Sequence, residues 1–255
     1  NGYMEFTGNH IHYVEGGNGF YMGAYFSSCT GANLMNRGDF SNNIIVGGKP
    51  GQTATNYGIY ITTASMKNFH NNTFVMLDGS TTSSAMTIYT GDGNEYVNNI
   101  FAVLPTDTSA TYTLGRGYSI YYSSGILINS DHNDFYSTSN APIYHLGVYN
   151  DLASYQAATM NDMNSYDANP DFVDTVNAIL CNAELDGAAM VNAITTDFAG
   201  NTRNPNTPDI GAREYQSVSN FSIGPDTTVC DIQTTLYVGA GAISISWQDA
   251  GSNIL

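Results

Sequence analysis

The chain has 255 residues, of which 22 are acidic and only 6 are Lys or Arg, so its formal net charge is -16 at pH 7. This charge repels the phosphate backbone of nucleic acids and anionic membrane surfaces. No stretch of the sequence approaches the roughly 20 apolar residues of a membrane-spanning helix. We therefore expect no nucleic-acid partner and no membrane insertion.

The N-terminal residues carry neither a targeting signal nor a complete metal site. Residues 1–5 lack the basic and apolar regions of a signal peptide, so we expect the sequence to begin inside a longer precursor. His10 and His12 alternate onto one face of a predicted strand, but no third ligand accompanies them. Ordinary strand histidines are the alternative to a metal pair.

A short pattern recurs along the first half of the chain: an aromatic or small residue, an Asn two or three positions later, and then a large apolar residue. The Asn of this pattern stands at five positions, which are Asn9, Asn43, Asn72, Asn99 and Asn133. Repeats at intervals of 27 to 34 residues indicate a solenoid, a propeller or an array. The segments between them are β-branched and aromatic runs separated by Gly, Asn, Asp and Ser, which predicts about three strands per repeat.

Stacking of these repeats would place the five Asn side chains above one another, one per strand spacing of about 4.8 Å. Each amide would then satisfy turn backbone that is otherwise buried without a partner. The apolar residues that follow would stack into a core: Ile11, Ile45, Phe74, Phe101 and Phe135. Asn is also a common turn residue, but that explains single cases rather than five in register. We predict an Asn ladder.

The two longest intervals predict insertions around residues 15–19 and 105–116, and insertions in solenoids loop out on one face, often the binding face. Tyr118, Tyr121 and Tyr122 lie beside the second insertion and are candidates for glycan contact, because tyrosine combines an apolar ring with a polar tip. The alternative is a set of tyrosines that pack over the outer sheet.

A candidate cation site follows at residues 91–95. Asp92, Asn94 and Glu95 would supply the oxygen ligands that Ca²⁺ prefers, and a plain turn is the alternative. Further along, Asp151 begins a predicted helix over residues 151–158, with Leu152 and Tyr155 on one side.

These features together resemble a known family. They are similar to the right-handed parallel β-helix, pectate-lyase-like repeat region of large secreted or surface bacterial proteins. The resemblance is carried by the repeated Asn-Asn-apolar segments, residues 130–136, the helix, residues 164–165 and 169–172, and the closing stretches 197–203 and 208–215. The resemblance implies an all-β chain in which residues 1–216 form an N-terminally incomplete β-helix. Residues 181–187 depart from the family's usual pattern.

Residues 217–255 resemble a linker and the truncated start of an immunoglobulin-like or PKD-like module, in which Cys230 and Trp247 occupy the places of an inter-sheet cysteine and a core tryptophan. This accounts for an odd number of cysteines, since Cys29, Cys181 and Cys230 lack metal-ligand spacing. The combination of modules is similar to cargo of the type nine secretion system. It implies a secreted or cell-surface location.

The fold alone also suggests carbohydrate chemistry, because many β-helices are polysaccharide lyases or hydrolases. A lyase needs a cation or Arg to neutralise the substrate's carboxylate and a Lys or Arg to remove the adjacent proton. The chain has only 6 Lys and Arg residues, and we expect two of them, Arg203 and Arg213, to pair with Asp209 or Glu214 in the closing segment. No adjacent Asp-Asp pair or Gly-His-Gly segment occurs.

The sequence thus favours a noncatalytic, extracellular structural or adhesive module whose partners are polysaccharides or cell-surface glycans and further domains of the same chain. The alternative is a carbohydrate-active β-helix enzyme, either a polysaccharide lyase or a hydrolase, and a third hypothesis is a stalk without a ligand. No cofactor is required by any motif, and Ca²⁺ is the one candidate.

Overall fold

The computed structural model describes residues 4–12, 21–31, 33, 35–48, 55–77, 83–104, 117–125, 127–137 and 142–217. The two predicted insertions lie outside the described residues, as does nearly all of the module predicted from residue 217 onward, including Cys230 and Trp247. In the part of the chain that the structure describes, no helix has the length and apolar character needed to cross a membrane.

The described strands form three parallel sheets, each receiving one strand from every coil of the chain. Sheet A contains β1 (Glu5–Thr7), β5 (Gly38–Ser41), β9 (Lys67–His70), β12 (Asn94–Val97) and β15 (Leu127–Asp131). Sheet B contains β2 (His10–His12), β6 (Ile44–Gly48), β10 (Thr73–Leu77), β13 (Ile100–Leu104) and β16 (Asp134–Ser137). Sheet C contains β3 (Tyr21–Phe26), β7 (Asn56–Ile61), β11 (Ser84–Ile88), β14 (Tyr118–Tyr122), β17 (Ile143–His145) and β18 (Val148–Tyr149).

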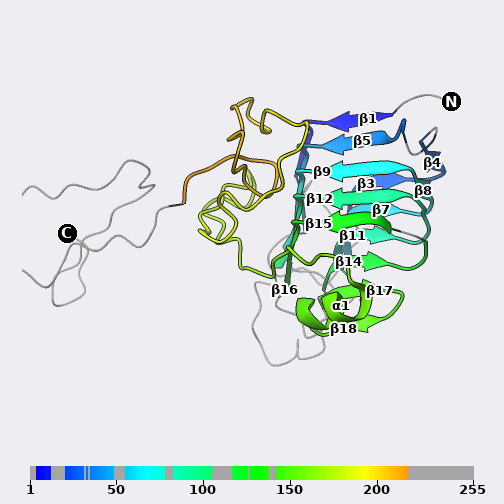
Figure 1. The fold of residues 1–255 in the computed structure, drawn as a ribbon. Helices are drawn as coiled ribbons and strands as arrows, with labels where there is room; N and C mark the ends of the chain where they lie inside the picture. The colour runs from blue at the N-terminus through cyan, green and yellow to red at the C-terminus, as the bar shows by residue number, and fades with distance from the viewer. Residues whose placement is uncertain are drawn as a thin grey trace, which may run out of the picture.

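The chain visits the sheets in the order A, B, C and returns to A beside the strand it left, as the stacked arrows of sheet A show in Figure 1. A small fourth sheet pairs β4 (Cys29–Thr30) with β8 (Ala64–Ser65) between sheets C and A. Every strand pair is parallel except β17 with β18. This arrangement is a parallel β-helix, which confirms the fold predicted from the repeat.

The core consists of side chains stacked in register along the axis. Ile11, Ile45, Phe74, Phe101 and Phe135 are direct partners in sheet B, as predicted. The ring centroids of Phe74 and Phe101, and of Phe101 and Phe135, are each 5.4 Å apart in stacked geometry. Parallel stacking places like residues over one another, so one aromatic position per coil builds a continuous column.

The Asn ladder runs through the interior beside this column. The side-chain oxygen of Asn43 accepts hydrogen bonds from the backbone and side-chain nitrogens of Asn9, both at 3.0 Å. The same pair of bonds links Asn43 to Asn72, Asn72 to Asn99, and Asn99 to Asn133, at 2.8 to 3.0 Å. The ladder continues beyond Asn133, whose backbone N–H donates to the hydroxyl of Ser165 and whose side-chain amide donates to Asp162. The buried Asn network is therefore a structural spine, in which the amides of Asn43, Asn72, Asn99 and Asn133 are engaged in hydrogen bonds.

The Asn that precedes three of the buried rungs, Asn43, Asn72 and Asn99, has a different role. Asn42, Asn71 and Asn98 adopt left-handed backbone conformations, with φ of 52°, 53° and 60°, and turn the chain from sheet A into sheet B. Asn tolerates this conformation better than most residues with a side chain. The repeated Asn-Asn pair thus combines a corner residue with a ladder residue.

Helix α1 (Leu152–Thr159) covers the last coil and agrees with the predicted helix to within one residue at each end. The side chain of Asp151 caps it by accepting a hydrogen bond from the backbone N–H of Ser154 at 2.6 Å. Leu152 and Tyr155 are buried, and the Tyr155 ring meets Phe135 of the final core rung edge to face. The helix shields the end of the core from water.

Residues 161–217 have little regular structure and lie along the outer face of sheet B, seen in yellow and orange in Figure 1. Ala178 and Ala212 pack on Ile44, Val46 and Val75, while Leu180, Leu185 and Ile210 pack on Ile100 and Ala102. Sheet B is consequently buried on both faces, which explains its nearly unbroken apolar strands. The outward faces of sheets A and C carry partly exposed side chains, such as Asp39 and Glu95 on sheet A and Tyr25 on sheet C.

Candidate functional site

The outward face of sheet C carries a row of tyrosines that crosses the strands. Tyr25, Tyr60, Tyr121 and Tyr144 are register partners on successive coils, except that Thr87 takes this place on β11. Tyr89, two residues beyond Thr87, fills the interval: its ring centroid is 5.5 Å from that of Tyr60 and 5.9 Å from that of Tyr121. We call Tyr25, Tyr60, Tyr89, Tyr121 and Tyr144 the tyrosine strip.

Ring contacts hold the strip together from end to end. Tyr25 stacks on Tyr60 at 5.8 Å, and Tyr121 stacks on Tyr144 at 4.4 Å, so every ring touches its neighbour. Tyr25 and Tyr89 are the most exposed members, with 55% and 42% of their surface accessible. Because the rings are already ordered by one another, a ligand that meets them causes little further loss of side-chain entropy.

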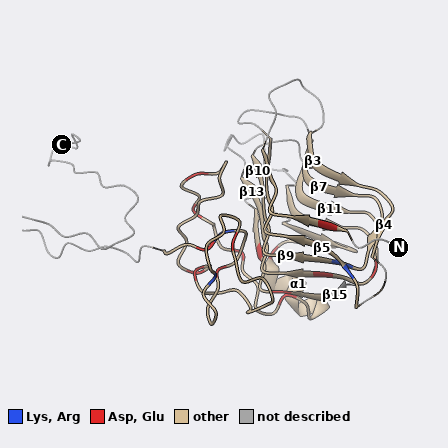
Figure 2. Cartoon of the chain, turned by 90° about the horizontal axis from the view of Figure 1, so that it is seen from above, with Lys and Arg blue, Asp and Glu red and all other residues tan. Residues whose placement is uncertain are grey.

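Charge is absent from the strands that carry the strip. β3, β7, β11, β14 and β17 contain no Asp, Glu, Lys or Arg. In Figure 2 the strands β3, β7 and β11 are uniformly tan, whereas coloured segments occur on sheet A and along residues 161–217. The strands of the strip thus differ from the chain as a whole, which has a net charge of -16.

The three predicted glycan-contact tyrosines divide between this face and the interior. Tyr121 belongs to the strip, and the ring of Tyr118 contacts it at 5.5 Å but is 6% exposed. Tyr122 is fully buried, and its hydroxyl donates to the carbonyl of Gly91. Its assignment to a surface site is wrong, because the alternating strand turns Tyr122 inward next to an outward Tyr121.

Sheet A presents a second outward surface, which is polar. The register aligns Glu5, Asp39, Asn68, Glu95 and Asn129 across five coils. Glu95 is held at both oxygens: Arg37 forms an ion pair with Oε2, and the Asn129 amide donates to Oε1 at 3.0 Å. Arg37 also donates to the side-chain oxygen of Asn68 at 3.2 Å.

His70 and Asp39 lie beside this ion pair, and their titration is perturbed. Burial raises the pKa of Asp39, an effect partly opposed by nearby His70 and by a hydrogen bond from Ser41. Burial lowers the pKa of His70, partly opposed by Glu95, whose Oε2 is 4.0 Å from His70 Nε2. Arg37, Asp39, His70 and Glu95 form the acid–base cluster of sheet A, which sequence reasoning did not identify.

The predicted cation site does not form from Asp92, Asn94 and Glu95. Asn94 is buried, where its amide donates to the carbonyl of Ala64 and its oxygen accepts from the backbone N–H of Lys67. Glu95 points outward to Arg37, and Asp92 is exposed in the preceding turn. Strand alternation separates Asn94 from Glu95, and the described residues contain no group of three His, Cys, Asp or Glu side chains placed to hold a metal.

The two N-terminal histidines also have structural neighbours. The ring centroids of His10 and His12 are 5.4 Å apart, so the strand does place them on one face. His10 Nε2 lies 2.7 Å from the carbonyl oxygen of Val176, and its ring meets Phe198 edge to face. His10 therefore helps to hold residues 161–217 against sheet B.

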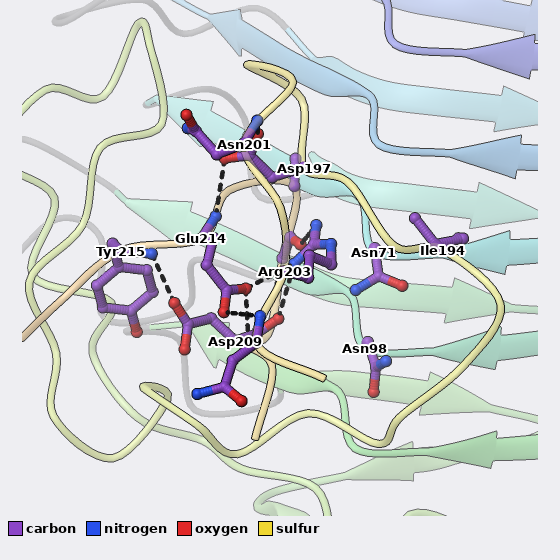
Figure 3. A network of polar contacts seen from close by, with 12 residues as sticks. Asn71, Asn98, Ile194, Asp197, Asn201, Arg203, Asp209, Glu214 and Tyr215 are labelled. Carbon is purple, nitrogen blue, oxygen red and sulfur yellow. Dashed lines mark hydrogen bonds and ion pairs between the residues drawn. The ribbon is translucent and has the colours of Figure 1, made fainter. Parts of the chain in front are cut away.

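Arg203 is the centre of a buried network that fixes the same segment, shown in Figure 3. Its guanidinium donates to the carbonyl of Gly211 at 2.8 Å and to the side chain of Asn42 at 3.0 Å, and it forms an ion pair with Glu214. The expected pairing with Glu214 is therefore present for Arg203. Arg213 instead donates to the carbonyl of Asn177 at 2.6 Å and lies over the Phe198 ring.

The corner asparagines complete this attachment. Asn98 exchanges two hydrogen bonds with the backbone of Met190, Asn71 accepts from Asn192, and Asn42 donates to the carbonyl of Thr196. The segment was expected to close the end of the solenoid, but these contacts fix it along the side. The end is covered by α1.

No protein-family model matches the chain, and no curated protein or solved structure matches it either. The parallel β-helix is thus assigned from its own strand register and buried Asn network.

Proposed function

We propose that this chain is a noncatalytic structural and adhesive module of a large secreted or cell-surface protein, and that it contacts glycans through the tyrosine strip. The observation that supports the proposal is the strip itself: four ordered aromatic side chains on strands without a charged residue, joined by Tyr89 from the turn after β11. Tyrosine offers a flat apolar ring and a hydroxyl, and these suit the apolar faces and hydroxyl groups of sugars.

The wider setting of the proposal comes from the sequence resemblance. The pectate-lyase-like repeat pattern of large bacterial surface proteins, continued by an immunoglobulin-like or PKD-like module from residue 217, favours export to the cell surface, for which the type nine system is our candidate route. In such a protein the β-helix would space the neighbouring modules as well as display the strip.

The test is retention of the purified chain on a panel of immobilised polysaccharides, combined with mass spectrometry of the soluble fraction. Retention without released products is the expected result. Released oligosaccharides would contradict the noncatalytic part of the proposal, and the absence of retention on every polysaccharide would leave the stalk hypothesis in its place.

A second candidate function is glycoside hydrolysis, and the acid–base cluster of sheet A is the observation that favours it. Asp39, with its raised pKa, would serve as general acid, and Glu95, held by Arg37 and Asn129, as general base. The two residues are two coils apart, roughly 10 Å at the strand spacing of sheets, near the upper end of the separation found in inverting hydrolases.

Asp39→Asn and Glu95→Gln distinguish the two candidates. If the chain releases products and either substitution abolishes release while retention persists, the cluster is catalytic. If both variants behave as the parent in retention and product formation, the acid–base cluster is part of the structure of sheet A.

A further inference from the structure

We infer that the ligand of the tyrosine strip is a neutral, extended polysaccharide that lies along the coil axis and crosses the strands. This inference rests on the proposed function and names the chemical class and orientation of the glycan. Three features of the described residues support it: the charge around the strip, the state of its hydroxyl groups, and its direction.

The charge distribution disfavours an acidic polysaccharide. A polyuronate approaches a chain of net charge -16, and it needs Lys or Arg to pair with its carboxylates. The four basic side chains in the described residues are all paired, hydrogen-bonded or buried. Arg37 pairs with Glu95 on sheet A, Lys67 is buried on β9, and Arg203 and Arg213 hold the C-terminal segment.

A cationic polysaccharide has a different difficulty. The net charge would attract it over long distances, but the strip's strands provide no carboxylate for its amino groups to contact. Long-range attraction of this kind is screened by salt. A neutral polysaccharide is neither repelled by the net charge nor dependent on carboxylates, because it can bind through the hydroxyl groups and ring faces of the strip.

The hydroxyl groups of Tyr60 and Tyr121, two members of the strip, remain protonated over the physiological range. Burial raises the pKa of Tyr60 to about 12 and also raises the pKa of Tyr121, with a further contribution from the neighbouring tyrosines in both cases. A protonated phenol both donates and accepts a hydrogen bond, as a sugar hydroxyl does. The tyrosine hydroxyl groups can therefore exchange hydrogen bonds with the hydroxyl groups of an uncharged sugar.

The direction of the strip sets the shape of the ligand. Tyr25, Tyr60, Tyr121 and Tyr144 span four coil steps, which at about 4.8 Å per step is roughly 19 Å along the axis. Successive ring centroids are 4.4 to 5.9 Å apart, so contact is continuous along this length. A compact or branched glycan would meet only one or two rings, whereas an extended chain would meet all of them.

The experiment is isothermal titration calorimetry of the chain with a length series of neutral, unbranched oligosaccharides, and in parallel with a polyuronate and a deacetylated amino polysaccharide, each at low and high salt. Affinity for the neutral series should rise with length until the oligosaccharide reaches roughly 19 Å, and then level off. Tyr25→Ala and Tyr89→Ala should each weaken binding about tenfold.

Two controls separate the strip from general surface effects. Met163→Ala removes an exposed side chain, 56% accessible, from the C-terminal segment and should leave affinity unchanged. Tyr89→Phe keeps the ring and removes the hydroxyl, so a smaller loss than that of Tyr89→Ala assigns part of the contact to the ring. Circular dichroism and thermal melting confirm that each variant is folded.

The outcomes separate this inference from the proposed function. Binding of the polyuronate or the amino polysaccharide as tightly as the neutral series at high salt, or affinity that ignores length, overturns the inference and leaves glycan adhesion intact. Absence of binding to every polysaccharide overturns both. If Tyr25→Ala and Tyr89→Ala abolish self-association measured by sedimentation, without any glycan binding, a second copy of the chain is the occupant and both fail.

Discussion

Replacing Asn99 by alanine tests whether the Asn ladder stabilises the β-helix. The Asn99 side chain accepts from the backbone N–H and the side chain of Asn72 at 3.0 and 2.9 Å, and donates to the carbonyl of Phe69 at 2.7 Å and to Asn133 at 3.0 Å. All four residues are buried. Asn99→Ala therefore removes the acceptor of one buried backbone N–H and a donor to one buried carbonyl.

A buried donor left unsatisfied costs about 1–3 kcal/mol, and loss of an ordinary internal hydrogen bond costs about 0.5–1.5 kcal/mol. We therefore expect Asn99→Ala to lower the free energy of unfolding by about 2–4 kcal/mol. This is a substantial part of the 5–15 kcal/mol that typically stabilises a domain, so the variant should unfold at clearly lower urea concentration. Far-ultraviolet circular dichroism follows the transition.

Asn9→Ala is the matched control, because Asn9 is the same residue at an exposed end of the ladder. Its amide donates to Asn43 and to the carbonyl of Thr7, and Asn43 keeps its bond from the Asn9 backbone after substitution. We expect a loss of about 0.5–1.5 kcal/mol. Equal losses in the two variants, or a loss below about 1 kcal/mol for Asn99→Ala, would refute the view that the interior ladder stabilises the coils.

Three further predictions concern the core and the C-terminal segment. Phe101→Ala opens the stack between Phe74 and Phe135 and should cost about 3–5 kcal/mol in urea unfolding. Arg203→Ala removes the ion-pair partner of the partly buried Glu214, which should cost about 3–5 kcal/mol and expose residues 161–217 to limited proteolysis. Burial raises the pKa of Asp162 from 3.8 to about 6, and its Oδ2 has no hydrogen-bond partner within the described part of the chain. Because the folded state holds the proton more tightly, this contribution to stability is fully present below pH 3.8 and is lost as the pH rises through about 6. Asp162→Asn should flatten the dependence of unfolding free energy on pH across that window.

The sequence allowed the ladder and the core column to be predicted because both repeat once per coil with a fixed spacing from each other. Asn43 and Ile45, or Asn72 and Phe74, differ by two positions in every coil, so one motif located both. The capped helix was predictable for a similar reason, since Asp151 and the buried pair Leu152 and Tyr155 are local signals. Local and periodic information was sufficient for these elements.

The roles of the corner asparagines depend on contacts that are distant in sequence. Asn98 meets Met190 across 92 residues, and Arg203 meets Asn42 across 161. No local pattern distinguishes an Asn that turns the chain from one that also holds a remote segment. The same is true of Arg37 and Glu95, which become neighbours only because β5, β9 and β12 stack.

The tyrosine strip was hidden by irregular spacing rather than by weak local signals. Each of Tyr25, Tyr60, Tyr121 and Tyr144 has an inward-facing neighbour on both sides, which is an ordinary outward strand position. Yet their separations in the chain are 35, 61 and 23 residues, because connections differ in length and one coil places Thr87 at this position. Parallel stacking converts these unequal intervals into steps of one, two and one coil along the axis. Surfaces of such solenoids are therefore recognised from strand register, and the sequence intervals alone do not reveal them.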